Sequence, residues 1–380
     1  MKVVICGAGI AGLTLAGKLG ALGHAVVVVE RSAGPRAEGY MIDFFGPGYD
    51  AAERMGLLPR FHELGYRFLE AGYHDETGRR RAGLSFERFA DTLDGRMTSI
   101  MRPDVELILR SALPPGVTVR FGAGVVAVDN RADGVSVALS DGSTLDADLL
   151  VGADGIHSTV RRLVFGDEAR FFRYLGFHTA AFTFTDPEIH ALVAGRFCLT
   201  DTVGRQIGCY GLRDGRVAAF TVHRTPDPTL PADPRAAVRA AYGTLGWIVP
   251  RVLDRCPPEI YYDQVAQIEL PRWRTGRVVL VGDACGAVSL LAGQGASLGM
   301  GGAFVLAEHL DDPDAYEQRW RPIVLEKQQV ARSGARWFLP ATPLRLHARR
   351  WAMRLARVPW IDRRIAAGLV GKPTALVSER

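Results

Sequence analysis

The chain has 380 residues, 48% of them hydrophobic, and a formal net charge of +5. This length is too great for one simple core and small for three, which predicts two closely packed domains. The positive charge is not gathered into a compact basic and aromatic patch, so nucleic-acid binding is not expected.

The cysteines and the first residues bear on the cellular compartment. The five cysteines are an odd number without CxxC spacing and lie mostly in apolar runs, which indicates buried thiols in a reducing compartment. A strand pattern begins almost at the first residue, without the apolar stretch and cleavage site of a signal peptide, so a cytoplasmic protein is expected. No metal site is expected.

The N-terminus has the pattern of a strand, a glycine turn and a helix. Apolar residues 3–5 precede Gly7, Gly9 and Gly12, and apolar residues then recur at helical spacing to residue 19. Such a turn lets the backbone approach a pyrophosphate, and the helix N-terminus offers free N–H groups to that anion. A second strand, 25–29, ends at Glu30 and Arg31, which places a carboxylate where a ribose hydroxyl would need an acceptor. A structural glycine turn without a ligand is the alternative.

The next elements alternate between loop, helix and strand patterns. Residues 34–50 are rich in glycine, proline and aromatic side chains, which predicts a long loop leading to a helix near 49–55. Arg102 and Pro103 open a second predicted helix. Alternating patterns predict strands at 117–121, 124–129 and 135–140, with a hairpin turn at Asp141 and Gly142, and a buried strand at 149–151.

The pattern changes between residues 171 and 262. Strand-like runs at 177–185, 206–212 and 216–221, and a helical pattern at 234–245, predict an antiparallel sheet in an inserted second domain. A buried strand at 276–281 then returns the chain to the first domain.

An uncharged stretch at 284–307 is long enough to cross a bilayer. Its six glycines, together with Gln294, Ser289 and Ser297, make it a poor lipid-facing helix, so we expect a loop and a buried helix and no membrane insertion. The C-terminal pattern puts Leu344, Ala348, Trp351, Leu355 and Val358 on one helical face and Arg345, Arg349 and Arg357 elsewhere. This predicts a solvated helix docked on both domains, with attraction to an anionic membrane surface as the alternative.

Taken together, the motifs resemble those of the single-component FAD-dependent aromatic hydroxylases, which include para-hydroxybenzoate hydroxylase and the tetracycline-inactivating monooxygenases. The resemblance covers roughly residues 1–339 and rests on the glycine turn, on Asp154, Gly155, Ser158 and Arg161, and on Gly282 and Asp283 followed by the loop 293–295. It implies an α/β fold (α+β overall): a discontinuous Rossmann-like FAD-binding domain at 1–170 and 271–335, an antiparallel-sheet substrate domain at 171–270, and a C-terminal helical segment at 336–380.

The resemblance also implies which residues hold FAD. A carboxylate and an arginine near the pyrophosphate would organise the phosphates and the incoming nicotinamide. The N–H groups of Gly295 and Ala296 would stabilise negative charge at the N1 and O2 edge of the flavin. An ordinary helix cap with Ser158 and Arg161 on a surface turn is the alternative for the second motif. The implied cofactor residues are Gly7, Gly9, Ala11, Gly12, Glu30, Arg31, Arg102, Asp154, Gly155, Arg161, Gly282, Asp283, Gly293, Gly295 and Ala296.

The activity implied is monooxygenation. NADPH or NADH would reduce the flavin, and a flavin C4a-hydroperoxide would hydroxylate or epoxidise a bulky, mostly apolar small molecule, an aromatic or polyketide natural product of the kind met in antibiotic biosynthesis. The chain departs from the family where a His and prolines usually follow Gly-Asp, since it has Gly286, Ala287 and Leu290 there, and Ser297 and Gly302 replace an Asn and an Asp. No catalytic acid or base is identified.

Substrate contacts are expected from two places. Tyr40, Asp43 and Phe44 lie on the loop near the flavin, whereas His178, Tyr210 and His223 lie on the sheet that would cover it. Phe177, Phe182, Phe184 and Phe220 suggest an apolar lining. Three alternatives stay open. The first is a flavin-dependent halogenase, which shares the fold, but this chain lacks the Trp-x-Trp-x-Ile-Pro element of the halogenases. The second is a redox-neutral cyclase that keeps FAD as a scaffold. The third is a regulatory protein that binds flavin without turnover. The sequence does not indicate an oligomeric state.

Overall fold

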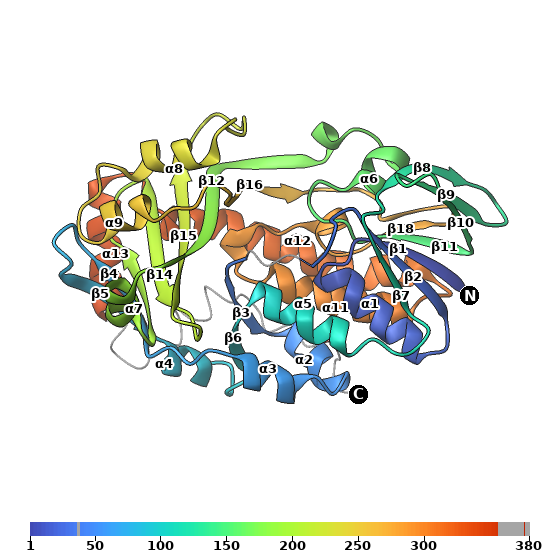
Figure 1. Cartoon of the computed structure of the whole chain (residues 1–380), viewed down its shortest axis with the longest axis horizontal. Helices are drawn as coiled ribbons and strands as arrows, with labels where there is room; N and C mark the ends of the chain where they lie inside the picture. The colour runs from blue at the N-terminus through green and yellow to red at the C-terminus, as the bar shows by residue number, and fades with distance from the viewer. Residues whose placement is uncertain (36–38, 356–375, 377–380) are drawn as a thin grey trace.

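The computed structural model describes residues 1–35, 39–355 and 376, and the described chain forms two halves, each built on one large sheet (Figure 1). The sheet of the first half has six strands in the order β17-β18-β11-β1-β2-β7. Every neighbouring pair is parallel except β17 with β18. Its strands are β1 (Lys2–Cys6), β2 (Ala25–Glu30), β7 (Thr118–Phe121), β11 (Leu149–Gly152), β17 (Arg274–Thr275) and β18 (Val278–Leu280).

This sheet is covered on both faces, as its apolar strands require. Val3, Val4 and Ile5 of β1 are fully buried, which is the rule for parallel strands between two layers. Helices α1 (Ile10–Ala21), α5 (Arg102–Ser111) and α11 (Gly295–Glu308) form one layer. A three-stranded antiparallel sheet of β8 (Val125–Asn130), β9 (Val135–Leu139) and β10 (Thr144–Ala147) lies on the other side, beside α6 (Thr159–Val164). The predicted strands and hairpin of this half are confirmed, as are the helices near 49–55 and from Arg102. The long loop expected at 34–50 is wrong in part, because residues 41–45 form a strand.

The second half contains a seven-stranded sheet in the order β16-β12-β15-β14-β13-β4-β5. Antiparallel pairing runs through it except between β13 and β4. Its strands are β4 (Glu70–His74), β5 (Arg80–Ser85), β12 (Phe172–Thr185), β13 (Arg196–Thr200), β14 (Arg205–Gly211), β15 (Arg216–Arg224) and β16 (Tyr261–Ile268). The strands β4 and β5 come from the part of the chain that the sequence division placed in the first domain, because their glycines and charged residues hide the alternation. The sheet therefore extends beyond the expected 171–270.

One face of the seven-stranded sheet is sealed by short helices. These are α7 (Pro187–Val193), α8 (Pro234–Tyr242) and α9 (Val249–Asp254), whose apolar residues form one cluster with Phe182 and Phe184 of β12. The opposite face is turned towards the first half.

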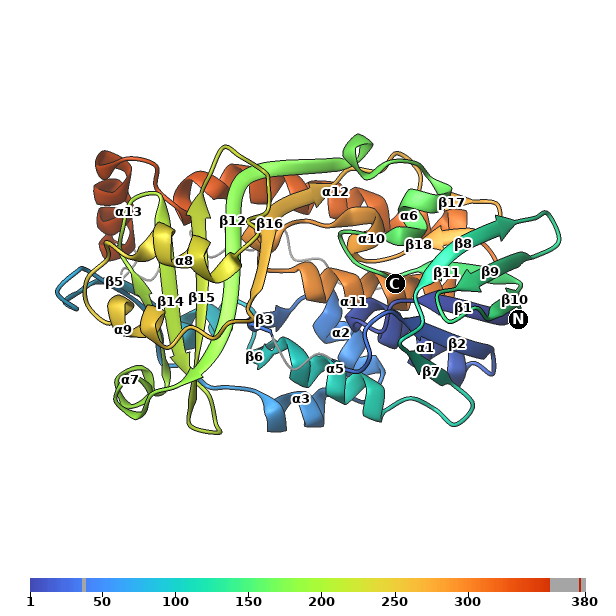
Figure 2. The same cartoon turned by 45° about the horizontal axis from the view of Figure 1, so that its top comes forward.

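Three elements connect the halves. A two-stranded ribbon of β3 (Met41–Phe45) and β6 (Met97–Met101) lies between them, and the long strand β12 and the helix α12 (Pro313–Phe338) run from one half to the other (Figures 1 and 2). Helices α2 (Pro47–Arg54), α3 (Leu58–Leu64) and α4 (Phe86–Asp91) flank the ribbon. The closed region between the sheets is therefore bordered by segments from most of the chain.

The C-terminal helix α13 (Pro343–Leu355) docks in a way that its apolar pattern does not indicate. Leu344 and Trp351 are 80% and 66% exposed, whereas Arg349 is buried. Arg349 and Arg350 lie 2.9 and 2.5 Å from the two carboxylate oxygens of Asp201, a buried residue that follows β13. An ion pair, rather than the apolar face, fixes this helix to the second half. Val358 and Arg357 lie outside the described residues.

The uncharged stretch 284–307 forms α10 (Asp283–Gly286), a 3-10 turn (Leu290–Ala292) and the buried helix α11. Within the described part of the chain, no helix combines the length and apolarity needed to cross a membrane. All five cysteines are buried and free, as expected.

Candidate active site

Two adjoining hollows bring the three sequence motifs together, a smaller one within the first half and a larger one between the halves. The smaller hollow, of about 170 Å³, is bordered by the glycine turn and the end of β2. The larger, of about 330 Å³, extends from the N-terminal ends of α1 and α11 to the seven-stranded sheet. Gly9, Arg102, Ala153 and Gly155 border both. The hollows therefore form one elongated site with a polar end and an aromatic end.

The glycine turn is fixed by backbone packing. A Cβ atom on Gly7, whose φ is +110°, would lie 2.4 Å from the carbonyl oxygen of Ala153, and a Cβ on Gly12 would lie 1.9 Å from the carbonyl oxygen of Gly7. Only glycine fits either place. Gly9 ends the turn and borders both hollows, and α1 starts there with its first N–H groups uncapped by a side chain. That N-terminus is suited to an anion.

The carboxylate of Glu30 is held at the rim of the smaller hollow. The amide of Ala8 donates to one of its oxygens at 2.9 Å, and the amide of Ser32 donates to the other at 2.9 Å. Arg31 borders the same hollow. Both residues thus lie where the sequence places a contact to the ribose of a nucleotide.

The second motif divides between the site and the scaffold. Asp154 borders the smaller hollow and also accepts from the Val160 amide at 3.1 Å, and Ser158 caps α6 by accepting from the Arg161 amide at 2.9 Å. Arg161 is fully buried and borders neither hollow. The prediction that Arg161 lies against the cofactor disagrees with this placement.

The guanidinium of Arg161 is used inside the protein. It donates to the carbonyls of Ala284 and Ile156 at 2.9 and 2.6 Å and pairs with Glu168 at 2.6 Å. Burial lowers its pKa, and Glu168 opposes that shift. Arg161 therefore links the second motif to the third. Ser158 caps the helix as the alternative expects, but Arg161 is buried rather than on a surface turn.

The third motif closes the larger hollow. A Cβ on Gly282, whose φ is +65°, would lie 2.9 Å from the Cβ of Ala11, so glycine permits the contact between this turn and α1. Gly282 itself does not border the larger hollow, whereas Asp283 and Ala11 do. Asp283 lines this hollow, and burial raises its pKa while Arg102 opposes the rise.

The loop before α11 leaves room for a bound group. Gly293 has φ +63°, and no atom lies within 4 Å of the place that a Cβ on it would take; the space beside Gly155 is equally open. Gly293, Gly295 and Ala296 border the larger hollow, where α11 begins. The hydroxyl of Ser289, beside them, is buried without a hydrogen-bond partner, on a backbone with the strained φ of +74°. Open glycines, a helix N-terminus and an orphan hydroxyl fit a flat polar group such as a flavin ring.

Of the predicted substrate residues, Tyr40, Asp43 and Tyr210 border the larger hollow. Phe44 does not, because its neighbour Asp43 takes the inward side of β3 and Phe44 packs against Phe61 in the core of the first half.

His178 and His223 also lie away from the hollow. They are paired across β12 and β15 on the face that carries the short helices, where their Nδ1 atoms lie 3.1 and 3.2 Å from the hydroxyls of Tyr262 and Tyr242. Burial lowers the pKa of both, that of His223 to about 4. Thr179, one residue along, borders the hollow instead. Of the four expected phenylalanines only Phe220 borders it, since Phe182 and Phe184 share the histidines' face and Phe177 packs against Leu339.

Several bordering residues have no sequence signal that singled them out. Phe68 and Phe86 flank the unrecognised strands β4 and β5, and Phe197 begins β13. Tyr261 and Asp263 lie on the part of β16 that borders the hollow. His157 borders the smaller hollow and bridges Glu168 and Asp263 at 2.9 and 3.1 Å, which raises its pKa to about 9.

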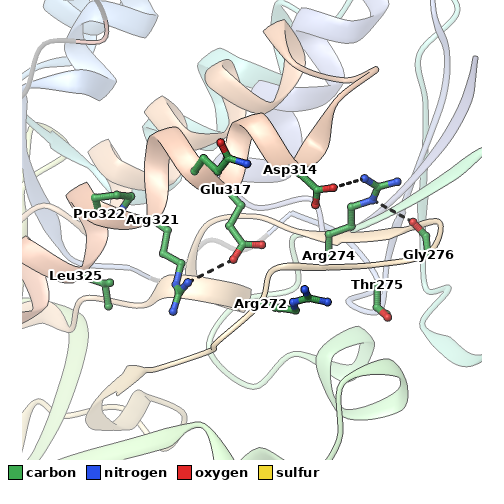
Figure 3. Close-up of a pocket in the computed structure, with 10 residues that line it drawn as sticks. Arg272, Arg274, Thr275, Gly276, Asp314, Glu317, Arg321, Pro322 and Leu325 are labelled. Atoms are coloured by element: carbon green, nitrogen blue, oxygen red, sulfur yellow. Dashed lines mark hydrogen bonds and ion pairs between the residues drawn. The ribbon is translucent and has the colours of Figure 1, made fainter.

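A further hollow, of about 620 Å³, lies on the surface between β17 and α12 (Figure 3). Its charges are largely paired with each other, Arg274 with Asp314 at 2.9 Å and Arg321 with Glu317 at 3.6 Å. None of the motif residues borders it. Within the described residues, no cluster of three or more His, Cys, Asp or Glu could hold a metal ion.

Comparison with known proteins agrees with this geometry. Residues 1–313 match the family model described as FAD binding domain. The uncharacterized protein Rv1260 of Mycobacterium tuberculosis (strain ATCC 25618 / H37Rv) is 35% identical over 81% of this chain and 84% of its own. A flavin-dependent monooxygenase from an unknown prokaryotic organism is 28% identical over 87% of each chain.

The fold is found among solved structures as well. The crystal structure of tetracycline destructase Tet(55) aligns with a TM-score of 0.84 and 24% identity over 100% of this chain and 98% of that one. The match over most of the chain, together with the site, shows that this protein belongs to the FAD-dependent flavoprotein monooxygenase family and is an FAD-dependent oxidoreductase.

Proposed function

We propose that this enzyme uses NADPH or NADH and O₂ to hydroxylate or epoxidise a bulky, mostly apolar small molecule, an aromatic or polyketide natural product. The observation that carries the proposal is the single elongated site whose polar end is built from the glycine turn and Glu30 and whose other end is aromatic. Such a site suits a nucleotide at one end and an apolar substrate at the other.

The residues at the polar end fit the adenosine and pyrophosphate parts of FAD. The carboxylate of Glu30 is oriented by two backbone amides, and each carboxylate oxygen can accept more than one hydrogen bond, so a ribose hydroxyl can add to them. The N-terminus of α1 at Gly9 lies at both hollows and would receive the pyrophosphate, and Arg102 lines both hollows. Asp154 and Arg31 complete this end of the site.

The residues at the junction fit the flavin ring. When bound, FAD supplies the redox chemistry, which passes electrons from the nicotinamide to O₂ for transfer of one oxygen atom. The N–H groups of Gly295 and Ala296, at the start of α11, would stabilise negative charge on the edge of a bound flavin. Phe68, Phe197 and Phe220 keep water away from the reacting atoms.

Transient binding of the nicotinamide is part of the proposal. The sequence contains one glycine fingerprint after a strand, at residues 7–12, and that fingerprint belongs to the FAD end. The reductant would therefore use the same open site rather than a domain of its own.

A redox-neutral cyclase with FAD as a scaffold is the second candidate. The loop after Asp283 favours it, because Gly286, Ala287 and Leu290 replace the family's His and prolines beside the reactive side of the ring, and Ser289 there is strained.

One experiment separates the candidates. Purified yellow holoenzyme is incubated with a panel of aromatic and polyketide compounds, with and without NADPH, while NADPH oxidation, O₂ uptake and product mass are followed. The proposal requires a product heavier by one oxygen atom, with NADPH and O₂ consumed in equal amounts. A product formed at unchanged mass without NADPH identifies the cyclase, and a bound flavin that neither NADPH nor NADH reduces refutes the monooxygenase.

A further inference from the structure

The carboxyl group of Asp43 occupies an unusual position in the larger hollow. Asp43 lies on β3 directly opposite Ser99 of β6. The hydroxyl of Ser99, a buried residue, donates to Oδ1 of Asp43 at 2.5 Å. The side chain of Asp43 is partly exposed, and that exposure is towards the hollow. The ribbon thus holds one carboxylate oxygen and presents the group to the site.

The other charged groups around this hollow are paired or lie at the cofactor end. Arg102 pairs with Glu106 at 2.9 Å. Asp263 lies 3.1 Å from His157 and accepts from the amide of Gln264 at 2.8 Å. Asp283 lies beside the loop before α11, at the end assigned to the cofactor. Asp43 differs from Arg102 and Asp263, because among the described residues no arginine, lysine or histidine pairs with it. It differs from Asp283 in its place, because it lies at the aromatic end of the hollow.

The surroundings of Asp43 are aromatic. Burial raises the pKa of the Tyr210 phenol on β14, and the nearby Asp43 carboxylate adds to the rise. The Tyr210 hydroxyl accepts from the Met41 amide at 2.7 Å. Phe68 and Phe86 border the same end of the hollow. Burial raises the pKa of Asp43, and the Ser99 hydrogen bond opposes that rise. A carboxylate without a cation in such a place gains most from a hydrogen-bond donor on the ligand.

We propose that Asp43, positioned by Ser99, binds a phenolic or enolic hydroxyl of the substrate and accepts its proton during oxygen transfer. This rests on the monooxygenase function proposed above and narrows its substrate class to hydroxylated aromatic or polyketide compounds. The substrate O–H bond breaks and the proton moves to the free oxygen of Asp43. The electron pair stays on the substrate oxygen, where it raises electron density at the ortho and para carbons that take up the oxygen atom supplied through the flavin and O₂.

The structure also explains why a neutral acceptor would not serve equally well. A general base is most effective when its pKa approaches the working pH, and burial moves Asp43 in that direction. The Ser99 hydroxyl cannot take the proton, since it is itself the donor to Asp43. Its role is positioning.

The test uses oxidised holoenzyme without nicotinamide and two probes, 1-naphthol and 1-methoxynaphthalene, which differ in the hydroxyl proton. Binding is read from the perturbation of the flavin absorbance between pH 5 and 8. We expect 1-naphthol to bind the wild type at least about tenfold more tightly than its methyl ether at pH 8, the effect of one hydrogen bond to a charged group. That preference falls as the pH drops through the raised pKa of Asp43, because the protonated carboxyl is a poorer acceptor.

The variants separate this role from a structural one. Asp43→Asn keeps the shape and the Ser99 contact, and it is expected to lose the preference and its pH dependence while the methyl ether binds as before. Ser99→Ala is expected to retain a weakened preference. The methyl-ether profile controls for the other charged and titratable groups that line the same hollow, Asp263, Asp283, Arg102, Tyr40 and Tyr261. Asp133→Asn, which changes a carboxylate that is 91% exposed in the turn before β9, is the matched control.

The outcomes are distinct from those of the proposed function. Equal binding of both probes, no binding of 1-naphthol, or a preference that survives in Asp43→Asn overturns the role of Asp43. None of these results depends on turnover. Failure of NADPH oxidation or O₂ uptake would instead count against the monooxygenase proposal and leave the binding result standing.

Discussion

Replacing Arg161 with methionine distinguishes a cofactor-binding arginine from a structural one. The resemblance implies a contact with FAD, whereas the structure buries the guanidinium against the Ala284 and Ile156 carbonyls and Glu168. Methionine retains much of the apolar stem but none of the donors. The expected consequence is a less stable protein rather than a site that has lost one contact to the cofactor.

The magnitude follows from what remains after the change. Breaking a buried ion pair by removing one partner costs about 3–5 kcal/mol. Glu168 is 33% exposed and its other carboxylate oxygen stays 2.9 Å from Nδ1 of His157, so its charge is not stranded. We therefore expect the lower end, about 3 kcal/mol, much of it from the two carbonyl groups that lose a charged donor.

Urea unfolding of the apoprotein and the holoenzyme, with FAD affinity measured on the folded protein, provides the assay. Arg161→Met should lower the unfolding midpoint of both forms by a similar amount and leave FAD affinity near the wild-type value. Arg162→Met is the matched control, because Arg162 is the exposed neighbour on the same helix and its removal should change stability by less than about 0.5 kcal/mol. An apoprotein of unchanged stability that binds FAD poorly would refute this reasoning and restore the cofactor contact.

Three further predictions concern the turn, the histidine bridge and the C-terminal helix. Gly12→Ala puts a Cβ against the Gly7 carbonyl and should lower the free energy of unfolding by about 2–3 kcal/mol. It should also cause loss of bound FAD, read from the yellow colour of the purified protein. The control Gly334→Ala, in the open interior of α12, should instead raise the free energy of unfolding by about 0.5–1 kcal/mol. The pKa of His157 rises from its usual 6.5 to about 9, so its contribution to stability is present in full below pH 6.5 and is lost as the pH rises through 9. Unfolding midpoints between pH 6 and 10 should show this decline in the wild type and a smaller one in His157→Gln; equal slopes would contradict it. Asp201→Ala leaves Arg349 buried without its carboxylate partner, which should lower the free energy of unfolding by about 3–5 kcal/mol. Faster tryptic cleavage within α13 would show that the helix has loosened. Resistance to trypsin equal to that of the wild type would argue that the ion pair does not hold the helix in place.

The sequence was informative where a local pattern has one physical explanation. The glycines at 7, 9 and 12 lie between a buried strand and a helix, and the contacts of Gly7 and Gly12 leave no room for another residue. Likewise the hairpin at Asp141 and the proline-started helix at Arg102 are local structures, and both occur as expected. Such elements are specified within a few residues of the chain.

The side of the sheet that each residue faces was beyond this local reasoning. His178 and Thr179 are adjacent on β12, yet only Thr179 faces the hollow, because alternate side chains of a strand point to opposite faces. Which face meets the cofactor half is decided by α8 and α9, which cover the other face from a distant part of the chain. The strands β4 and β5 join the sheet only through pairing with β13, more than 100 residues later.

The two ends of the site are built from different parts of the chain, which bears on how this enzyme can diversify. The nucleotide end draws on the glycine turn and β2, whereas the aromatic lining comes chiefly from strands β13, β14 and β15 and from the flanks of β4 and β5. If substrate binds at the aromatic end as proposed, exchanging Phe68, Phe197 or Tyr210 should change which substrates fit and leave the residues proposed to hold FAD unchanged. Natural selection, or a mutant library confined to the aromatic lining, can then change the substrate range while the cofactor site stays the same.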